Sequence, residues 1–219
     1  MSPAPTLYGK GQLPRETSRN TLGLLHGGLL CLDFVNTVDD HGAGGNDQFA
    51  PGYVNIVEWF VHAGVVDDEA ARRLLLKAGK EPREAAAVRK RATSLRSALF
   101  EIVSALTISE DPQAESLALF NQEIQHSLAS GGFVFDGVAL AWQWNEGNDL
   151  DRMLWDVSRS AADLFSSSRL ARVRQCAAPA CQKFFLDASK NRSRRFCSSA
   201  TCGTAARVRR FRERQKSTP

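Results

Sequence analysis

The sequence contains no long hydrophobic run, which excludes a membrane-spanning helix. Such a helix needs about 18 or more apolar residues in succession, whereas the longest apolar stretch, Leu29 to Val38, is interrupted by Asp33 and Asn36. A signal peptide, a P-loop, a paired-glycine nucleotide fingerprint, a nucleophile elbow and internal repeats are also lacking. We therefore expect a cytoplasmic protein that does not contact membranes and that lacks the enzyme chemistry these motifs carry.

Histidines and acidic residues are scarce in residues 169–219. This segment has no histidine and only two carboxylates, Asp187 and Glu213, and the four histidines lie far upstream, at His26, His41, His62 and His126. Cleavage of a phosphodiester needs a general base and usually a second metal site. A metal-dependent nuclease is therefore a weak alternative, and we expect no enzyme.

Positive charge is abundant in the same segment. Residues 169–219 carry 14 lysines and arginines against two acids, a net charge of +12, whereas residues 1–168 carry 14 basic and 22 acidic residues, a net charge of −8. Charge concentrated in this way exceeds what solubility requires and predicts a nucleic-acid partner. The candidate contact residues are Lys190, Arg192, Arg194, Arg195, Arg207, Arg209, Arg210, Arg212 and Arg214.

Four cysteines lie within this basic segment in the pattern C-x4-C-x15-C-x4-C, at Cys176, Cys181, Cys197 and Cys202. Two close pairs of thiolates can surround one tetrahedral Zn²⁺. Two disulfides would leave Cys31 unpaired and would conflict with a reducing cytosol, and the nearby cations favour thiolates over four buried free thiols. We predict one structural zinc ion in a closed site, since no histidine is near.

Hydrophobic periodicity predicts a mostly helical chain after a proline-containing extended arm at residues 1–20. The apolar, β-leaning segment from Gly28 to Thr37 predicts a buried strand, which a glycine-rich loop follows. Residues 133–144 predict a β-hairpin that turns at Asp136-Gly137. Helices are expected at about 53–63, 66–76, 82–107, 117–130 and 149–167.

These motifs resemble the bacterial ABATE-domain family, whose members end in a CGNR-type zinc finger. The resemblance covers nearly the whole chain. It rests on Leu32-Asp-Phe-Val-Asn-Thr37, Trp59 and Leu119-Phe-Asn121, and on Cys176-Ala-Ala-Pro-Ala-Cys181, Phe185-Leu-Asp187-Ala-Ser-Lys, Arg194-Arg-Phe-Cys197, Cys202-Gly203 and Arg209-Arg-Phe-Arg-Glu-Arg214.

The resemblance implies an α+β protein in two parts. A mostly helical, sensor-like domain with a few strands and a β-hairpin would occupy residues 21–168, and a small, treble-clef-like, DNA-binding finger would occupy residues 169–219. The family is regarded as one of stress-associated transcription regulators. In one departure, Thr204-Ala205 stands where the family signature has Asn-Arg, so the role of that arginine is absent here or has moved to Arg207.

A helix that begins near Cys202 would sort the basic residues onto faces. Ala205, Val208 and Phe211 would pack against the cysteine cluster and Phe196; the second face would carry Arg207, Arg210 and Arg214, and the third Arg209, Arg212 and Lys216. Arginine suits bidentate contacts to phosphates or guanine edges. The sequence does not say which arginine would read a base.

The expected function is that of a bacterial transcription regulator that binds double-stranded DNA. Polar Asp33 and Asn36, near His26, form a candidate pocket for a small-molecule effector, although such residues more often satisfy backbone groups. A homodimer is expected because a lone finger buries only roughly 600–1,000 Å². The alternative is an RNA-binding or ribosome-associated protein, whose stacking platforms would have to come from Phe184, Phe185, Phe196 and Phe211.

Overall fold

The computed structural model describes residues 25–38, 47–145, 147, 149–179 and 181–216. The arm expected at residues 1–20 and the glycine-rich loop at residues 41–45 lie outside the described residues. Contacts divide the chain into two compact units, and neither is continuous in sequence. Unit 1 contains residues 48–95 and 118–159, and unit 2 contains residues 25–47, 96–117 and 160–219.

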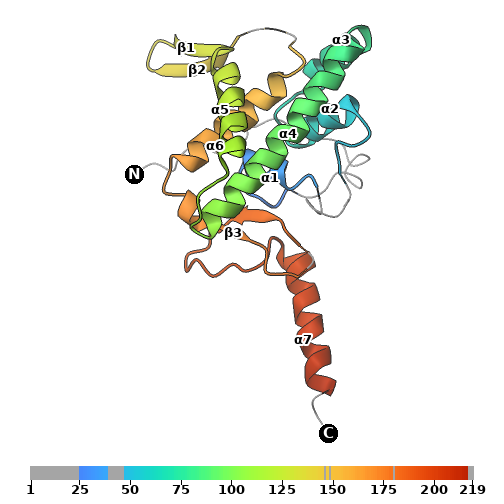
Figure 1. Ribbon diagram of the computed structural model, residues 1–219, viewed down its shortest axis with the longest axis vertical. Coiled ribbons are helices and arrows are strands. Elements are labelled where there is room, and N and C mark those ends of the chain that lie inside the picture. The colour runs from blue at the N-terminus through green and yellow to red at the C-terminus, as the bar shows by residue number, and fades with distance from the viewer. Residues whose placement is uncertain (1–24, 39–46, 146, 148, 180, 217–219) are drawn as a thin grey trace. The chain divides into compact units, whose positions relative to one another are not determined.

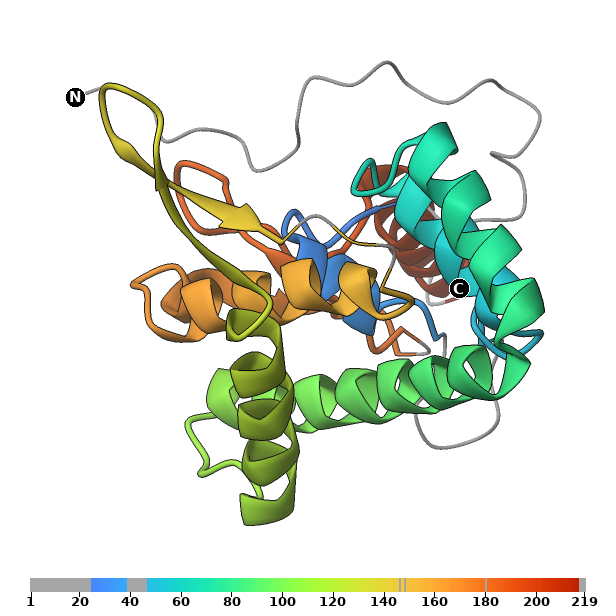
Figure 2. The ribbon, with the colours of Figure 1, turned by 90° about the horizontal axis from the view of Figure 1, so that it is seen from above.

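The described chain forms helices and two short antiparallel strand pairs, as the α+β expectation requires (Figures 1 and 2). The helices are α1 (Leu30–Val35), α2 (Tyr53–His62), α3 (Asp68–Lys80), α4 (Pro82–Thr107), α5 (Ala114–Leu128), α6 (Arg152–Phe165) and α7 (Thr204–Lys216). The strands are β1 (Gly131–Phe135), β2 (Leu140–Trp144), β3 (Val173–Gln175) and β4 (Phe184–Leu186). None of the described helices is long and apolar enough to cross a membrane.

The prediction of a strand at residues 28–37 is wrong, because this segment forms helix α1. All the α1 residues from Cys31 to Val35 are buried, so the sequence shows a continuous apolar run without the period that separates a helix from a strand. The carboxylate of Asp33 accepts a hydrogen bond from the Gly27 N–H (2.6 Å), and the Asp33 N–H donates to Leu29 O (2.9 Å). These bonds close the first turn of the helix.

The other expected helices are confirmed, with ends shifted by a few residues. Helix α2 stops before Gly64, which adopts the left-handed conformation (φ 72°) that costs glycine little. Helix α3 runs on to Lys80, beyond the expected end at Leu76. Helix α4 has the expected bounds, and its apolar stripe is buried at Val88, Leu95, Leu99, Ile102 and Val103 and half-buried at Leu106.

Unit 1 contains an aromatic core and a polar network. The ring of Trp59 packs edge-on against Phe49 and Phe60, with centroid distances of 5.9 and 4.9 Å. In the network, the guanidinium of Arg91 donates to both carboxylate oxygens of Glu123 (3.0 and 2.7 Å) and to Asp151 (2.9 Å). The ring of His126 lies 2.6 Å from the same Asp151 oxygen. Paired carboxylates of this kind offset the cost of burying charge.

The hairpin in unit 1 follows the sequence prediction. Strands β1 and β2 are antiparallel, with Phe133 opposite Trp142 and Phe135 opposite Leu140. At the turn, the Asp136 carboxylate accepts from the backbone N–H groups of Val138 (2.9 Å) and Ala139 (2.8 Å). These backbone bonds lower the Asp136 pKa and hold the tight connection.

Unit 2 joins α1 to the cysteine-containing segment. The Asn36 side chain accepts from the Phe184 N–H and donates to the Phe184 carbonyl, both at 2.8 Å, so it occupies the outer edge of β4 as a further strand would. The Leu186 N–H donates to Gly27 O (2.8 Å). The boundary expected at residues 168/169 therefore does not coincide with the contact units, because residues 25–47 and 160–219 share one.

Candidate metal centre and nucleic-acid interface

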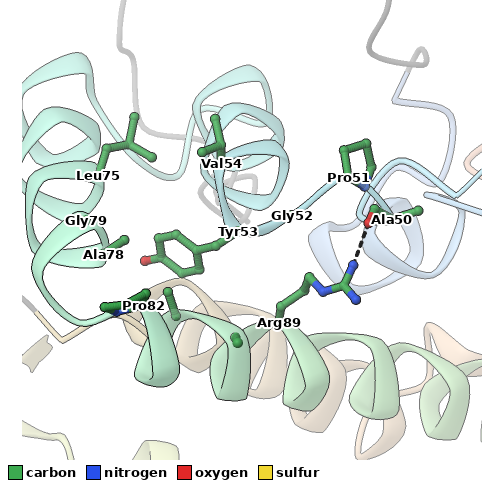
Figure 3. Close-up of a pocket in the computed structure, with 12 residues that line it drawn as sticks. Ala50, Pro51, Gly52, Tyr53, Val54, Leu75, Ala78, Gly79, Pro82 and Arg89 are labelled. Atoms are coloured by element: carbon green, nitrogen blue, oxygen red, sulfur yellow. Dashed lines mark hydrogen bonds between the residues drawn. The ribbon is translucent and has the colours of Figure 1, made fainter.

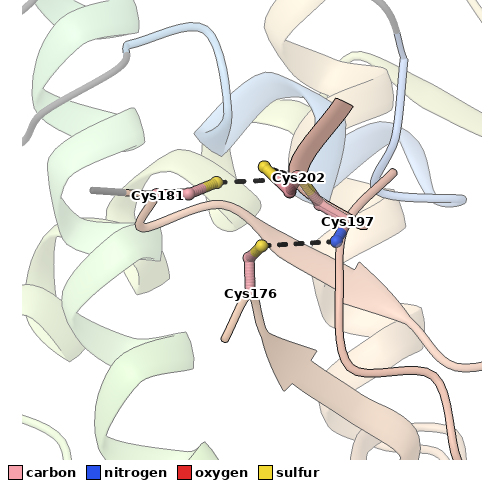
Figure 4. A group of neighbouring side chains, drawn as sticks. All are labelled: Cys176, Cys181, Cys197 and Cys202. Atoms are coloured by element: carbon pink, nitrogen blue, oxygen red, sulfur yellow. Dashed lines mark hydrogen bonds between the residues drawn. The ribbon is translucent and has the colours of Figure 1, made fainter. Parts of the chain in front are cut away.

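The first cysteine pair lies on the loop between β3 and β4. These strands pair antiparallel, with Gln175 opposite Phe184, and the Cys176 N–H donates to Lys183 O (2.9 Å) at the end of the ladder. The Cys181 N–H then donates to Ala178 O (2.9 Å) within the loop. The C-x4-C spacing thus folds into a tight knuckle with both sulfurs on the same side (Figure 4).

The second pair lies just before α7. Cys197 precedes Ser198, whose side chain accepts from the Thr201 N–H (3.2 Å), and a single π-helical turn at Ser199–Gly203 carries Cys202. A Cβ atom at Gly203 would lie 3.3 Å from Ser198 O, which is closer than side chains usually approach, so glycine allows this turn to close. A hairpin knuckle followed by a second cysteine pair at the N-terminal end of a helix is the arrangement expected of a treble-clef-like finger.

The four sulfurs form a cluster of the right size for one ion. They all lie within 4.8 Å of one another, and the Cys181–Cys197 and Cys197–Cys202 Sγ distances are both 3.7 Å. Tetrahedral zinc, with a Zn–S distance near 2.3 Å, requires sulfur–sulfur distances of about 3.8 Å. All five cysteines are free, including the buried Cys31, and 3.7 Å is far beyond a disulfide bond. The disulfide alternative is therefore excluded.

The pKa values of the cysteine thiols also indicate a bound metal ion. A hydrogen bond from Cys197 lowers the pKa of Cys181 to about 5. The contact with Cys181, together with burial, raises the pKa of Cys197, and burial raises that of Cys202. Without a cation the cluster holds one thiolate readily and resists further ionisation. A divalent metal ion supplies the charge that allows all four thiols to ionise and coordinate.

The basic loop before Cys197 is held by internal contacts. The Asp187 carboxylate, which is buried, accepts from the Ser189 hydroxyl (2.5 Å) and from the Ser189 and Arg194 N–H groups (2.9 and 3.1 Å). The Ser189 hydroxyl bond lowers the Asp187 pKa. Arg192 sits at a positive φ of 51° within this loop. The loop therefore presents its cations on a fixed frame rather than on a flexible segment.

Arg194 differs from the other predicted contact residues because it faces inward. Its guanidinium donates to the carbonyls of Cys197 and Phe196 and lies over the Phe185 ring, 4.3 Å from the centroid. By contrast, the remaining candidates are exposed: Lys190, Arg192, Arg195, Arg207, Arg209, Arg210, Arg212 and Arg214. Arg194 therefore contacts the backbone around Cys197, and the other predicted contact residues make up the exposed basic surface.

The predicted packing face of α7 is wrong. Ala205, Val208 (43% exposed) and Phe211 (61%) all face solvent, and Ala206 (7%) is the helix residue buried against the finger. The π-helical turn before Thr204 determines which face of the helix meets the knuckle, and helical spacing alone does not reveal it. In Figure 1, only the N-terminal end of α7 lies against the rest of the finger. The helix is therefore a projecting rod with exposed side chains on most faces.

Arginines from the loop and the helix meet at one hollow, whose volume is about 610 Å³. Its lining includes Arg195 from the loop, Arg207 and Arg210 from α7, the inward-facing Arg194, and His26. Burial and the nearby cations Lys183 and Arg194 lower the His26 pKa. No acidic side chain lines the hollow, so its field favours an anion.

Arg207 performs a structural task as well. Its guanidinium donates to Thr204 Oγ1 (2.9 Å) and lies 3.4 Å from Ser199 O, and the Thr204 hydroxyl donates to Ser199 O (3.1 Å). Thr204 and Arg207 thus close the turn that carries Cys202. Whether the role of the missing signature arginine is absent or has moved to Arg207 stays a prediction.

The candidate ligand residues do not meet around one cavity. Asp33 and Asn36 are buried and form the internal hydrogen bonds described above, and neither lines the hollow beside the finger or the groove in unit 1. His26 instead lines the hollow beside the finger. Asp33 and Asn36 therefore satisfy backbone groups, which is the alternative role that their polar side chains suggested.

A second hollow, which the sequence analysis missed, lies within unit 1. It is a groove of about 630 Å³ between residues of α2, α3 and α4, lined mainly by apolar groups such as Val54, Leu75 and Pro82 (Figure 3). Arg89 stands at one side and donates to Ala50 O (2.5 Å). No sequence motif marks this groove, because its walls come from separate helices.

The comparisons with known proteins agree with this geometry. The sequence model of the CGNR zinc finger matches residues 172–215. The ABATE model, described as "Putative stress-induced transcription regulator", matches residues 28–168. No curated protein is matched by the chain. With the four-sulfur cluster inside the matched finger, the cofactor is a single structural Zn²⁺ held by Cys176, Cys181, Cys197 and Cys202.

Proposed function

Because the chain belongs to the ABATE family of stress-induced regulators and ends in a CGNR zinc finger, we propose that it is a cytoplasmic transcription regulator that binds double-stranded DNA through the finger. The observation that carries this proposal is the cationic hollow. Arg195, Arg207 and Arg210 line it together, and no acid does. Its positive charge suits the phosphate groups of the DNA backbone.

The remaining exposed cations extend this surface. Lys190 and Arg192 project from the loop, and Arg209, Arg212 and Arg214 lie along the exposed rod of α7. A projecting arginine-rich helix fits the width of a major groove. Arg209 approaches Glu213 at 4.0 Å with both side chains more than half exposed, a contact too weak to prevent a phosphate from competing.

RNA binding is the second candidate, and exposure of aromatic rings argues against it. Single-stranded RNA is usually held by stacking on exposed rings. Phe184 and Phe185 are fully buried, Phe196 is half-buried, and Phe211 alone among the finger's four phenylalanines is exposed. We also propose a binding rather than a catalytic role, since the Asp187 carboxylate already accepts three hydrogen bonds from its own loop.

The regulatory half of the proposal concerns the groove in unit 1. Its volume falls within the range of small-molecule sites. Two N–H positions of Arg89, Nε and Nη2, have no hydrogen-bond partner among the described residues. A small apolar molecule with one anionic group would match this lining. Decanoate should bind in calorimetry and decanol should bind at least tenfold more weakly; equal binding of the two would contradict a role for Arg89.

Fluorescence anisotropy with a mixed-sequence DNA duplex tests the DNA-binding half. Zinc-loaded protein should bind with an affinity that falls steeply with salt. Arg195→Gln and Arg210→Gln should each weaken binding to all sequences and reduce the log–log salt slope by about 1. Arg83→Gln is the matched control, because Arg83 is an exposed arginine of α4 in unit 1.

Three outcomes would contradict the proposal. Absence of binding at low salt would remove DNA as the ligand. An Arg83→Gln effect equal to that of Arg210→Gln would show that the hollow is not the contact. Preference for single-stranded RNA over the duplex in direct competition would favour the second candidate.

A further inference from the structure

The most exposed apolar surface of the described chain is concentrated on the β-hairpin. Within eight residues, five large apolar side chains face solvent: Phe133 (67% exposed), Val134 (45%), Phe135 (64%), Val138 (92%) and Leu140 (67%). With about 150–200 Å² for a fully exposed side chain of this kind, they expose on the order of 500 Å². That is as large as the largest apolar patch of a typical monomer, and such patches mark interaction sites.

The alternation of the strands assigns most of this surface to one face. Phe133 and Phe135 of β1 lie on the same face as their partners Trp142 and Leu140 of β2. Towards the base of the hairpin this face is covered, because Trp142 packs against Trp144 (5.4 Å between centroids) and Trp144 packs against Trp155 of α6 (5.7 Å). The rings of Phe133 and Phe135, nearer the turn, extend this aromatic row and remain mostly exposed among the described residues.

The edges of the hairpin are also unoccupied by the described strands. Strands β1 and β2 form a sheet of two strands only (Figure 2). An isolated hairpin is marginally stable in water, and open, apolar strand edges readily pair with another chain. The hairpin therefore lacks both a covering layer and neighbouring strands.

We propose that this hairpin face packs against the same face of a second copy of the chain. The distal face is self-complementary, because the segment from Gly131 to Trp144 contains a single charge, Asp136, at its turn. Two like surfaces can therefore meet without placing like charges in the contact, which is what a twofold interface requires. The exposed area is a large part of the roughly 800 Å² that each partner contributes to a standard interface.

Charge complementarity gives the orientation. The Arg159 guanidinium lies over the Trp142 ring, 5.3 Å from its centroid, and no described acidic residue pairs with it. Asp136 lies in the turn, at the opposite end of the hairpin from Trp142, where its carboxylate accepts from the Val138 and Ala139 N–H groups. When two hairpins lie antiparallel, the turn of each reaches the Trp142 row of the other, so Asp136 of one copy meets Arg159 of the second. A peptide or another protein without this spacing would not gain both contacts.

Sedimentation analysis of the zinc-loaded chain in the absence of DNA tests the proposal. The mass should approach twice the 24.0 kDa of one chain at roughly 100 µM, where a dimer with a micromolar dissociation constant is formed. Leu140→Lys should raise the dissociation constant at least tenfold. Asp136→Asn, which keeps the acceptor for the turn but removes the charge, should raise it severalfold.

The control substitution is Leu76→Lys. Leu76 is 69% exposed on α3, which matches Leu140 at 67%, so both changes carry the same chemistry and a similarly small folding cost. Circular dichroism of each variant confirms that it is folded. A wild-type mass of one chain at the highest concentration, or equal effects of Leu140→Lys and Leu76→Lys, would overturn the proposal. Because no DNA is present, this result is independent of whether the finger binds DNA.

Discussion

Asn36→Ala is the substitution that most directly tests how α1 supports the zinc finger. The Asn36 amide exchanges two hydrogen bonds of 2.8 Å with the backbone of Phe184, and both residues are buried, with 8% and 0% exposure. Alanine would leave the N–H and the carbonyl of Phe184 without these partners. Each unsatisfied buried group costs about 1–3 kcal/mol, so we expect a loss of about 2–4 kcal/mol in the free energy of unfolding.

Urea unfolding of the zinc-loaded protein, followed by circular dichroism, measures this loss. Asn121→Ala is the matched control, because Asn121 is exposed on α5, where alanine should be neutral or slightly stabilising. A loss below about 0.5 kcal/mol for Asn36→Ala, with an unchanged dependence on urea, would refute the reasoning. It would mean that water replaces the Asn36 amide at the edge of β4.

Three further predictions follow from the same contacts. After chelation of zinc, Cys181 should react with iodoacetamide in the folded protein, because its pKa is lowered to about 5, whereas Cys31 should react only after unfolding, because burial raises its pKa to about 12 and leaves it 2% exposed; fast reaction of Cys31 in the folded protein would contradict this. Arg96→Met should cost about 3 kcal/mol, since the buried guanidinium binds both oxygens of Asp47 (2.7 and 2.6 Å), and Asp47→Leu in the same chain should recover part of that loss in urea unfolding. Burial raises the pKa of Asp151, but bonds from Arg91 and His126 outweigh it and the net pKa is lowered; its stabilisation should therefore be complete above the ordinary Asp pKa of about 3.9 and vanish as the pH falls through the folded pKa. The difference in unfolding free energy between wild type and Asp151→Asn should then shrink between pH 6 and pH 3, and a constant difference would be the contrary result.

The family motif Leu32-Asp-Phe-Val-Asn-Thr37 acquires a physical meaning from these contacts. Asp33 closes the first turn of α1, Asn36 binds β4, and the Thr37 hydroxyl donates to Phe34 O (2.7 Å) and accepts from Arg96 (3.0 Å). Its polar residues therefore stabilise the unit that contains the zinc finger. A change in this motif would therefore act on the zinc finger through lost hydrogen bonds in unit 2 rather than through a ligand pocket.

The sequence by itself determined the features that depend on residues close together in the chain. Two C-x4-C pairs specify the zinc ligands because each pair needs only one short loop. Helical periodicity located α2 to α6, because one face of each of these helices is buried and leaves its period in the sequence. Asp136-Gly137 located the hairpin through its turn chemistry. The +12 charge of residues 169–219 likewise located the exposed basic surface.

Only the tertiary structure decided the features that depend on distant residues. Helix α1 carries no period because it is buried on all sides, and its Asn36 meets Phe184 from 148 positions away. The inward turn of Arg194 and the exposed face of α7 depend on how the chain leaves the metal centre. The zinc ligands could thus be predicted from local spacing. The cationic hollow exists only because folding brings a loop, a helix and His26 together.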